Sequence, residues 1–439
     1  MKDRRAALSL LAFILVLHIA FLLPQSSQFA GITEGYESTS CPGSLNGARS
    51  TLLLPSAKVG TKFLSALRSN FSHNSNGSLQ LSKGAVVIEG DPRNSLELQS
   101  KSGAWTSGIT CSGGDGESWF VGGSAGITSQ SKLVLDNSGL SDATVEVTTF
   151  SENGPSSPQS FTVSAASEKI IRLDALNPGA QKIVTKIKVV SGRVTSYLLD
   201  ERIKGLKNLG GDFVGRVSQP SKSQIISGIP STLGKNSSVN LFLRILVPGQ
   251  IDGTASVEVV STNGVFVPID LGEIALNSQE VVELPLKNLQ VGIENFALRI
   301  SASTPIVASV FADGSSKNLS DFTWHTAVQP FESTSFNLYG LTPTITFVSP
   351  KISVAAQWRD NRGKVYRKDF KGDEILNWKV PANTRLITLT SFTGTAASLT
   401  WVTGDGLGTL ALTKGPTLSS ATRPVAEISV IQPGRHQGH

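Results

Sequence analysis

Histidine is scarce in this chain of 439 residues, with five in all. They are His18, His73, His325, His436 and His439. A Ser-His-Asp triad or a histidine-based zinc site would have to be built on His73 or His325, because His18 falls in an apolar run and the last two in a polar tail. Two cysteines add too few ligands to complete a metal site. The composition therefore argues against both kinds of chemistry.

Charge is also sparse. Charged residues make up 16% of the chain, against about 25% in an average soluble domain. The net charge of +6 is small for this length. Cations are locally in excess from Arg359 to Arg385, which we interpret as a solvated strand face, the alternative being a polyanion-binding patch. We predict no nucleic-acid partner. With 39% hydrophobic residues the chain is still expected to be globular.

Methionine occurs once, whereas glycine occurs 42 times and proline 20 times. This composition favours many turns over long helices. Glycine-rich pieces such as Gly113–Gly116 and Gly404–Gly408 lack the strand, GxxxxGK[ST] and helix context of a phosphate-binding loop. We therefore assign them to turns.

The amino-terminal sequence predicts where in the cell the protein is located. Residues 6–23 form an apolar run at the short end of what spans a bilayer. Lys2, Arg4 and Arg5 should keep residues 1–5 in the cytoplasm, which places the bulk of the chain outside. We predict a single-pass membrane anchor followed by a linker at residues 24–40. The alternative is a signal peptide cleaved after Ala30, with secretion of the rest, although Gln28 fits poorly at such a cleavage site.

Cys41 and Cys111 both fall in the part that we place outside the cytoplasm. That compartment oxidises thiols, so the pair predicts a disulfide.

Short alternating segments separated by turns predict an all-β protein of tandem antiparallel β-sandwiches, immunoglobulin-like or jelly-roll-like. In one such segment the alternation places Val145 and Val147 on the core face. The segment Val145-Glu-Val147 recurs as Val257-Glu-Val259, and the turn Asn153-Gly154 recurs as Asn263-Gly264. This long internal period suits tandem sandwiches. The predicted units are an N-terminal β region at 41–118, sandwiches at 119–222, 223–328 and 329–414, and a disordered tail at 415–439.

In the third sandwich we expect separate strands at 344–348, 352–358, 364–370, 385–391, 398–402 and 409–412. The turn at Asp360–Gly363 predicts a hairpin over 352–370.

Several residues could carry chemistry, and each has a simpler interpretation. Asp313 and Asp321 could be paired acids of a glycoside hydrolase, but their spacing gives no geometric reason to prefer them. Loops at Asp115 or Asp405 could bind calcium only if further oxygens converge there. The six tryptophans could form a sugar-stacking platform, but one or two core anchors per sandwich is the simpler interpretation. They are Trp105, Trp119, Trp324, Trp358, Trp378 and Trp401. We assign no catalytic, cofactor-binding or metal-binding residues.

Several segments together resemble an uncharacterised family of membrane-anchored actinobacterial proteins, a domain of unknown function. The matching pieces are Ala104-Trp-Thr106, Cys111 with Asp115–Gly122, Lys132–Asn137, Ala143–Phe150, Ser191–Val194 leading into Asp200, and Asp321-Phe-Thr-Trp324. The resemblance implies an amino-terminal anchor and repeated β-sandwiches that face the cell wall. It implies no activity.

The anchor, the repeats and the missing catalytic set lead to one expectation. We expect a non-enzymatic cell-envelope protein that acts as a scaffold or partner for other surface components. The alternatives are a glycan-binding module, using surface tryptophans such as Trp378 and Trp401, and a cell-wall hydrolase.

Overall fold

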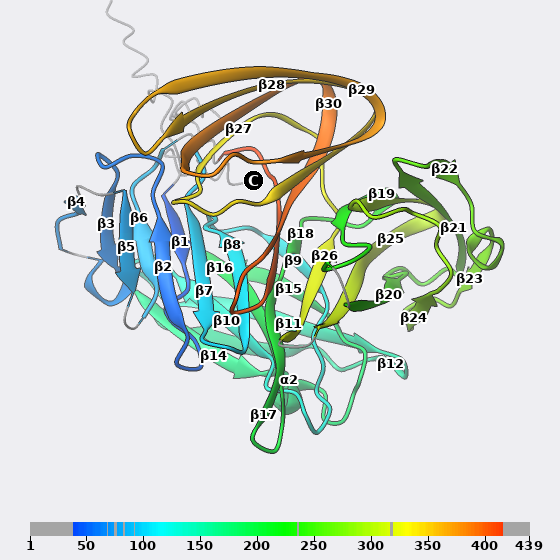
Figure 1. Ribbon diagram of the computed structural model, residues 1–439. Coiled ribbons are helices and arrows are strands. Elements are labelled where there is room, and N and C mark those ends of the chain that lie inside the picture. Colours follow the sequence, from blue (N-terminus) through cyan, green and yellow to red (C-terminus); the bar gives the residue numbers. More distant parts are fainter. Residues whose placement is uncertain are drawn as a thin grey trace, which may run out of the picture. The chain divides into compact units, whose positions relative to one another are not determined.

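The alternating segments of the sequence form antiparallel strands, which confirms the all-β prediction (Figure 1). The structure is a computed structural model that describes residues 38–415, except 68, 74–76, 82–83, 92, 235–236 and 317–318. In this range helix is limited to α2 (Leu173–Leu176) and the 3₁₀ turns η1 (Leu64–Ala66) and η2 (Ile269–Leu271). None of these helices is long or apolar enough to cross a membrane. The predicted anchor at 6–23, residues 1–5, most of the linker and the tail after 415 lie outside the described residues.

The N-terminal β region consists of two four-stranded sheets. Their strand orders are β1-β6-β3-β4 and β5-β2-β7-β8. The first contains Thr39–Cys41, Val86–Ile88, Gly60–Phe63 and Ser72–His73, and the second contains Ser78–Leu81, Arg49–Leu53, Leu96–Lys101 and Trp105–Thr110. The predicted disulfide between Cys41 and Cys111 is present, with Cα atoms 4.7 Å apart, and both cysteines are buried in the core of this region.

The next unit pairs a six-stranded sheet with a four-stranded one. The larger sheet has the order β12-β11-β15-β9-β18, with β13 also on β11, and the smaller has the order β14-β10-β16-β17. The larger contains Gly154–Pro155, Ala143–Ser151, Val184–Ser191, Glu117–Val121, Arg216–Val217 and Gln159–Val163. The smaller contains Ser167–Arg172, Lys132–Asn137, Val194–Lys204 and Lys207–Val214. Val145 and Val147 are buried between the sheets, as their alternation predicts.

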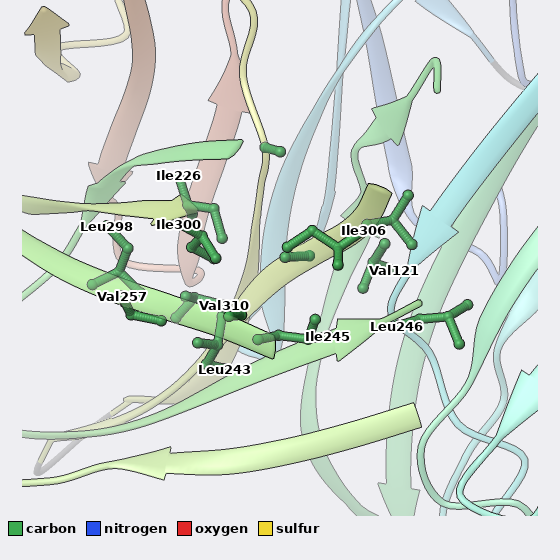
Figure 2. Packing of buried hydrophobic residues seen from close by; sticks show 14 of the residues in the cluster. Val121, Ile226, Leu243, Ile245, Leu246, Val257, Leu298, Ile300, Ile306 and Val310 are labelled. Atoms are coloured by element: carbon green, nitrogen blue, oxygen red, sulfur yellow. The ribbon is translucent and has the colours of Figure 1, made fainter. Parts of the chain in front are cut away.

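The third unit is built around β25 (Phe296–Ser316), which belongs to two layers. Its first half pairs with β21 (Gly253–Ser261) and β19 (Ser221–Ile229), and its second half with β20 (Ser238–Leu246) and β26 (Leu319–Thr326). The remaining strands are β22 (Gly264–Phe266), β23 (Ile274–Leu276) and β24 (Val281–Leu286). Aliphatic side chains from both layers form the largest core cluster, part of which Figure 2 shows.

The internal repeat is visible at its turns. In the Asn153-Gly154 turn, the Ser151 hydroxyl accepts the Asn153 N–H and donates to the Gly154 carbonyl, each at 3.2 Å. Ser261 makes the same two bonds at 3.2 Å in the Asn263-Gly264 turn. Equal turns at equivalent strand ends are what a duplicated sandwich requires.

The last unit is a single five-stranded sheet rather than two. Its order is β27-β30-β28-β29, with β31 also on β30. The strands are Phe331–Asn337, Thr384–Val402, Thr344–Asp360, Val365–Lys379 and Leu407–Ala411. The pairing register shifts between Val348 and Val354, around Pro350, and the long strands bend (Figure 1). The bend lets one sheet enclose a core, to which Leu53 and Leu96 of the N-terminal β region also contribute.

Candidate functional site: a buried joint and a surface groove

Among the described residues six carboxyl side chains are completely buried, which is unusual because ionisable groups are rarely placed inside a protein without partners. Two of them are Glu97 and Asp136. The other four are Asp200, Glu201, Asp212 and Asp321, each with 0% of its surface exposed. Together with Trp105, Trp324 and Arg244 they form what we call the joint, because their hydrogen bonds connect all four β units.

Asp321, on β26, contributes the widest set of connections. Its Oδ1 accepts the backbone N–H of Gly211 on β17 at 3.0 Å and that of Phe322 at 2.9 Å. Its Oδ2 accepts the N–H of Leu407 on β31 at 2.8 Å. Burial raises the pKa of Asp321, and these N–H groups act against the rise. One side chain therefore holds strands of three units together.

Asp200 and Glu201 are consecutive on β16 and therefore point to opposite faces of the sheet. Each accepts an indole N–H from a different unit. The Oδ2 of Asp200 accepts Nε1 of Trp324 at 3.0 Å, and the Oε1 of Glu201 accepts Nε1 of Trp105 at 3.1 Å. Asp200 also accepts from Ser131, at 2.8 Å, and Glu201 from Lys101, at 2.9 Å.

Asp212 connects the same units through backbone and hydroxyl donors. It accepts the hydroxyl of Ser107 on β8 and, at 2.7 Å, the backbone N–H of Trp324 on β26. Burial raises its pKa well above the usual range, and the nearby Asp321 and Asp200 add to the rise.

Arg244, on β20, carries the positive charge of the joint and is only 2% exposed. Its Nε and Nη2 donate to Oε2 of Glu283 at 2.9 and 2.7 Å. Its Nη1 reaches the preceding unit, donating to the carbonyls of Gly123 at 2.8 Å and Ile183 at 2.9 Å. Its guanidinium carbon lies 4.7 Å from the centroid of the Trp324 ring. Burial lowers the pKa of Arg244, and Glu283 opposes this.

Two glycines allow the close approach that the joint needs. A Cβ on Gly211 would lie 3.0 Å from the Trp105 ring, and Gly210 adopts a φ of 120°, which favours glycine. Larger side chains at these positions would push Asp321 and Trp105 away from β17.

The structure separates the two acids that the sequence nominated for glycoside hydrolysis. Asp313 pairs with Phe322, whereas Asp321 pairs with Gly314, so the two carboxylates project from opposite faces of the β25–β26 ladder. Asp321 is also fully engaged by backbone donors. The pair cannot flank one glycosidic bond.

The structure places the two candidate histidines in different surroundings. His325 is buried between the hydroxyls of Thr323, at 2.9 Å, and Thr409, at 3.3 Å, and burial lowers its pKa to about 3. His73 is exposed on β4, with Glu89 at 3.8 Å.

The two loop aspartates that we considered for calcium have structural partners. Asp115 is ion-paired with Arg216, and Asp405 accepts the N–H of Gly103 at 3.1 Å. Among the described residues no group of three or more acids, histidines or cysteines is arranged to hold a metal ion.

Five of the six tryptophans are buried, including Trp378 and Trp401, which lie in the core of the bent sheet. Trp358 alone is partly exposed. Trp105 and Trp324 belong to the joint, and Trp119 lies beneath Lys186, whose Nζ is 5.0 Å from the ring centroid. The tryptophans thus act mainly as anchors between and within units.

A groove of about 540 Å³ lies between the outer face of the β11-β15-β9 sheet and the loop after β20. Its floor is a row in which Lys188 pairs with Glu146 on one side and Glu117 on the other. The opposite wall includes the amides of Gln250 and Gln279. Gln279 has a positive φ of 63°, which is uncommon outside glycine. With two acids and two lysines in the lining, the groove suits a polar ligand without net charge.

Sequence reasoning singled out Asp200 only as part of a resemblance, and it considered Trp105 and Trp324 as sugar-stacking residues or, more simply, as core anchors. It missed Arg244, Glu201 and Asp212. Their one sequence signal is a charged residue inside an apolar alternating segment, such as Arg244 in Leu243-Arg-Ile245.

Comparison with known proteins gives a family match over more than half of the chain, and matches to solved structures with low scores. The model of a family of unknown function, DUF5719, matches residues 96–366, a range that contains all seven side chains of the joint. No curated protein matches the sequence. Among solved structures, Thermotoga maritima 1070 is 13% identical, covering 25% of this chain and 93% of its own, with a TM-score of 0.21. A tetra-tandem repeat from the extending region of a large adhesion protein is 11% identical, covering 88% and 95%, with a TM-score of 0.11. Such scores carry no inference about fold or function.

Proposed function

This chain belongs to DUF5719, a family of unknown function, and we propose that it is a non-enzymatic scaffold of the cell envelope, anchored in the membrane by residues 6–23. The joint is the observation that carries this proposal. Its buried acids bind backbone and indole N–H groups rather than facing a cleft, so they connect units instead of acting on a substrate. A scaffold needs such fixed connections, because partners bound to different units must be held at set distances.

The proposed location is extracytoplasmic, with the N-terminus inside, and the resemblance extends it to an actinobacterial envelope. The disulfide between Cys41 and Cys111 supports an oxidising compartment. The alternative is secretion after cleavage near residue 30.

Location and anchoring can be tested together on the full chain. We expect it in the membrane fraction, released by detergent but not by high salt, and degraded when protease is added to intact cells without their outer wall. Deleting residues 6–23 should abolish membrane recovery. A chain found whole in the cytosol contradicts the proposal, and a mature protein that begins near residue 31 supports the secreted form instead.

The scaffold role predicts binding without turnover. Detergent-solubilised full chain should co-purify with defined envelope components, and incubation with purified cell wall should release no reducing ends. Release of reducing ends that follows the protein through purification would establish a hydrolase and overturn the proposal.

The groove favours a second candidate, recognition of an uncharged glycan. Its amides, hydroxyls and balanced charges suit a ligand rich in hydroxyl groups, and the apolar Ile251 beside them is 74% exposed. Titration calorimetry with soluble wall oligosaccharides tests this. Gln250→Ala should weaken binding without changing stability, whereas the buried Trp378→Ala should lower stability. Binding that Gln250→Ala and Glu146→Ala both leave unchanged would place the ligand elsewhere.

A further inference from the structure

The β28–β29 hairpin carries an excess of positive charge at its turn. Five arginines or lysines and one aspartate lie between Trp358 and Lys368, and two more cations flank this segment. They are Arg359, Arg362, Lys364, Arg367 and Lys368, with Lys351 and Lys371 beyond, and all seven are exposed. In the part of the chain that the structure describes, none of them forms an ion pair with a carboxylate.

Two aspartates lie among these cations: Asp369, which is exposed on β29, and Asp360, which is committed to the turn itself. Oδ1 of Asp360 accepts the backbone N–H groups of Arg362 and Lys364, both at 2.9 Å, and Oδ2 accepts the hydroxyl of Tyr366 at 3.2 Å. The turn is therefore fixed by Asp360, and the surrounding side-chain cations remain available to an outside anion.

The strand register places three of these cations on one face. Arg359 lies opposite Val365, and Arg367, Asp369 and Lys371 follow at alternate positions along β29, so one acid lies between the last two cations. Arg367 and Lys371 are therefore about 13 Å apart along the strand. This row suits an extended ligand with repeated negative charges better than a single small anion.

The other face of the hairpin combines aromatic rings with cations. Trp358 and Tyr366 stack with centroids 5.5 Å apart and planes at 13°. Lys364 lies 5.1 Å from the Tyr366 ring, and Lys368 lies 4.9 Å from the Phe370 ring. These contacts hold the rings and the cations of this face against one another.

Edge protection is the competing explanation. β29 is the last strand of its sheet, and charged residues on an edge strand prevent pairing with another chain. That role is served by charges of either sign, however. It does not explain why acids are only two of the nine charged residues from Lys351 to Lys371, when they are 33 of the 72 charged residues of the chain.

We propose that the β28–β29 hairpin binds a repeating anionic polymer of the cell envelope. The inference rests on the proposed extracytoplasmic location for the identity of the polymer, but not for the binding itself. The polymer's anions can be phosphate or carboxylate groups, since both pair with lysine and arginine.

The test uses the full chain in neutral detergent and two fluorescent probes, inorganic polyphosphate and polygalacturonate. We expect at least one to bind, with an affinity that falls as salt rises. The double variant R367E/K371E should bind roughly tenfold or more weakly, because each cation near an anionic surface contributes about 1 kcal/mol. The slope of log affinity against log salt should fall by about two, given roughly 0.7–0.9 per contact with nucleic acids.

The matched control is K204E/K207E, at the exposed tip of the β16–β17 hairpin, which changes the net charge equally. We expect the control to bind like the wild type, and the charge-preserving R367K/K371R to retain binding. Because glutamates also block an edge, R367E/K371E should remain monomeric. An equal loss of polymer binding in R367E/K371E and K204E/K207E would show a general charge effect and overturn the proposal. Binding to micelles that contain phosphatidylglycerol, but to neither polymer, would overturn it as well. The preferred probe identifies phosphate or carboxylate. Fractionation of cells tests the location separately.

Discussion

Gly211 donates its backbone N–H to Oδ1 of Asp321 at 3.0 Å, although 110 residues separate the two in sequence. The other oxygen of Asp321 accepts from Leu407, 86 residues further on. Connections over such distances mean that the joint cannot form until three units are folded and in contact. The described residues accordingly belong to one compact unit rather than to separate, independent domains. Stability of the whole should therefore depend on a few buried polar groups.

Asp321→Asn is the sharpest test of the joint. Asparagine matches aspartate in shape, but its amide would place a donor against N–H groups that now meet a carboxylate. We expect a loss of about 2–4 kcal/mol in the free energy of unfolding, measured by urea denaturation. Asp313→Asn, on the neighbouring strand and half-buried, should cost less than about 1 kcal/mol. Equal effects of the two substitutions would show that the Asp321 bonds contribute little.

The stability of the protein should be equally sensitive to substitution of Arg244, for a different reason. Arg244→Met fills a similar volume but leaves Glu283 and the carbonyls of Gly123 and Ile183 without their donor. Breaking a buried ion pair in this way costs about 3–5 kcal/mol. Arg244→Lys keeps the charge but loses the forked geometry, so its cost should be intermediate.

The control for Arg244 is Arg299→Met. Arg299 bonds Glu258 at 3.0 Å and Glu374 at 2.6 Å, but its side chain is 22% exposed. Solvent screening should limit its cost to about 1 kcal/mol. Thermal unfolding of Arg244→Met, Arg244→Lys and Arg299→Met gives the order of the three losses in stability. A larger loss for Arg299→Met than for Arg244→Met would contradict the prediction.

The sequence correctly predicted those features of the fold that depend on the local pattern of residues. Val145 and Val147 alternate with polar neighbours and are buried, and the turn at Asp360–Gly363 closes the predicted hairpin. Local pattern misled where a strand bends. Separate strands were expected at 344–348 and 352–358, yet β28 runs through both and through Pro350, and the interruption is a register shift. Predicted boundaries at 118 and 222 likewise fall inside β9 and β19.

The joint could not be predicted from the sequence, for a physical reason. An acid inside a strand, such as Asp200, is normally taken for a solvent-facing residue, because burial without a partner costs too much. Its partners Ser131 and Trp324 are 69 and 124 residues away, so no local window contains them. Asp321 was considered only as a possible member of a catalytic pair that the spacing gave no reason to prefer, since sequence alone does not show which face it occupies.

The disulfide should contribute substantially to stability. It joins residues 70 positions apart, and closing a loop of that length constrains the unfolded chain by about 4 kcal/mol. We expect C41A/C111A to lower the unfolding midpoint by a corresponding amount, and a reductant to lower the midpoint of the wild type but not of the variant. Unchanged stability in the double variant would show that the bond is dispensable.

Two buried acids outside the joint, Glu97 and Asp136, should make stability depend on pH. Glu97, on β7, is fully buried, and burial raises its pKa to about 8, while hydrogen bonds from Ser50 and Gln99 oppose the rise. Burial and the neighbouring acids Glu168 and Glu97 also raise the pKa of Asp136. Both carboxyls are therefore neutral in the folded protein at pH values where they ionise in the unfolded chain.

The direction in which stability changes with pH follows from the number of protons bound in the folded and unfolded states. Below its ordinary pKa of 4.5, Glu97 is protonated in both states, and its contribution is fully present. As pH rises toward 8, the unfolded chain releases the proton first, so the folded state loses stability. We expect urea unfolding to show the wild type roughly 2 kcal/mol or more less stable at pH 8 than at pH 5. Glu97→Gln should reduce this difference without abolishing it, because Asp136 titrates in the same direction, whereas exposed Glu332→Gln should leave it unchanged. Identical pH dependence in wild type and Glu97→Gln would mean that Glu97 is already ionised in the folded protein.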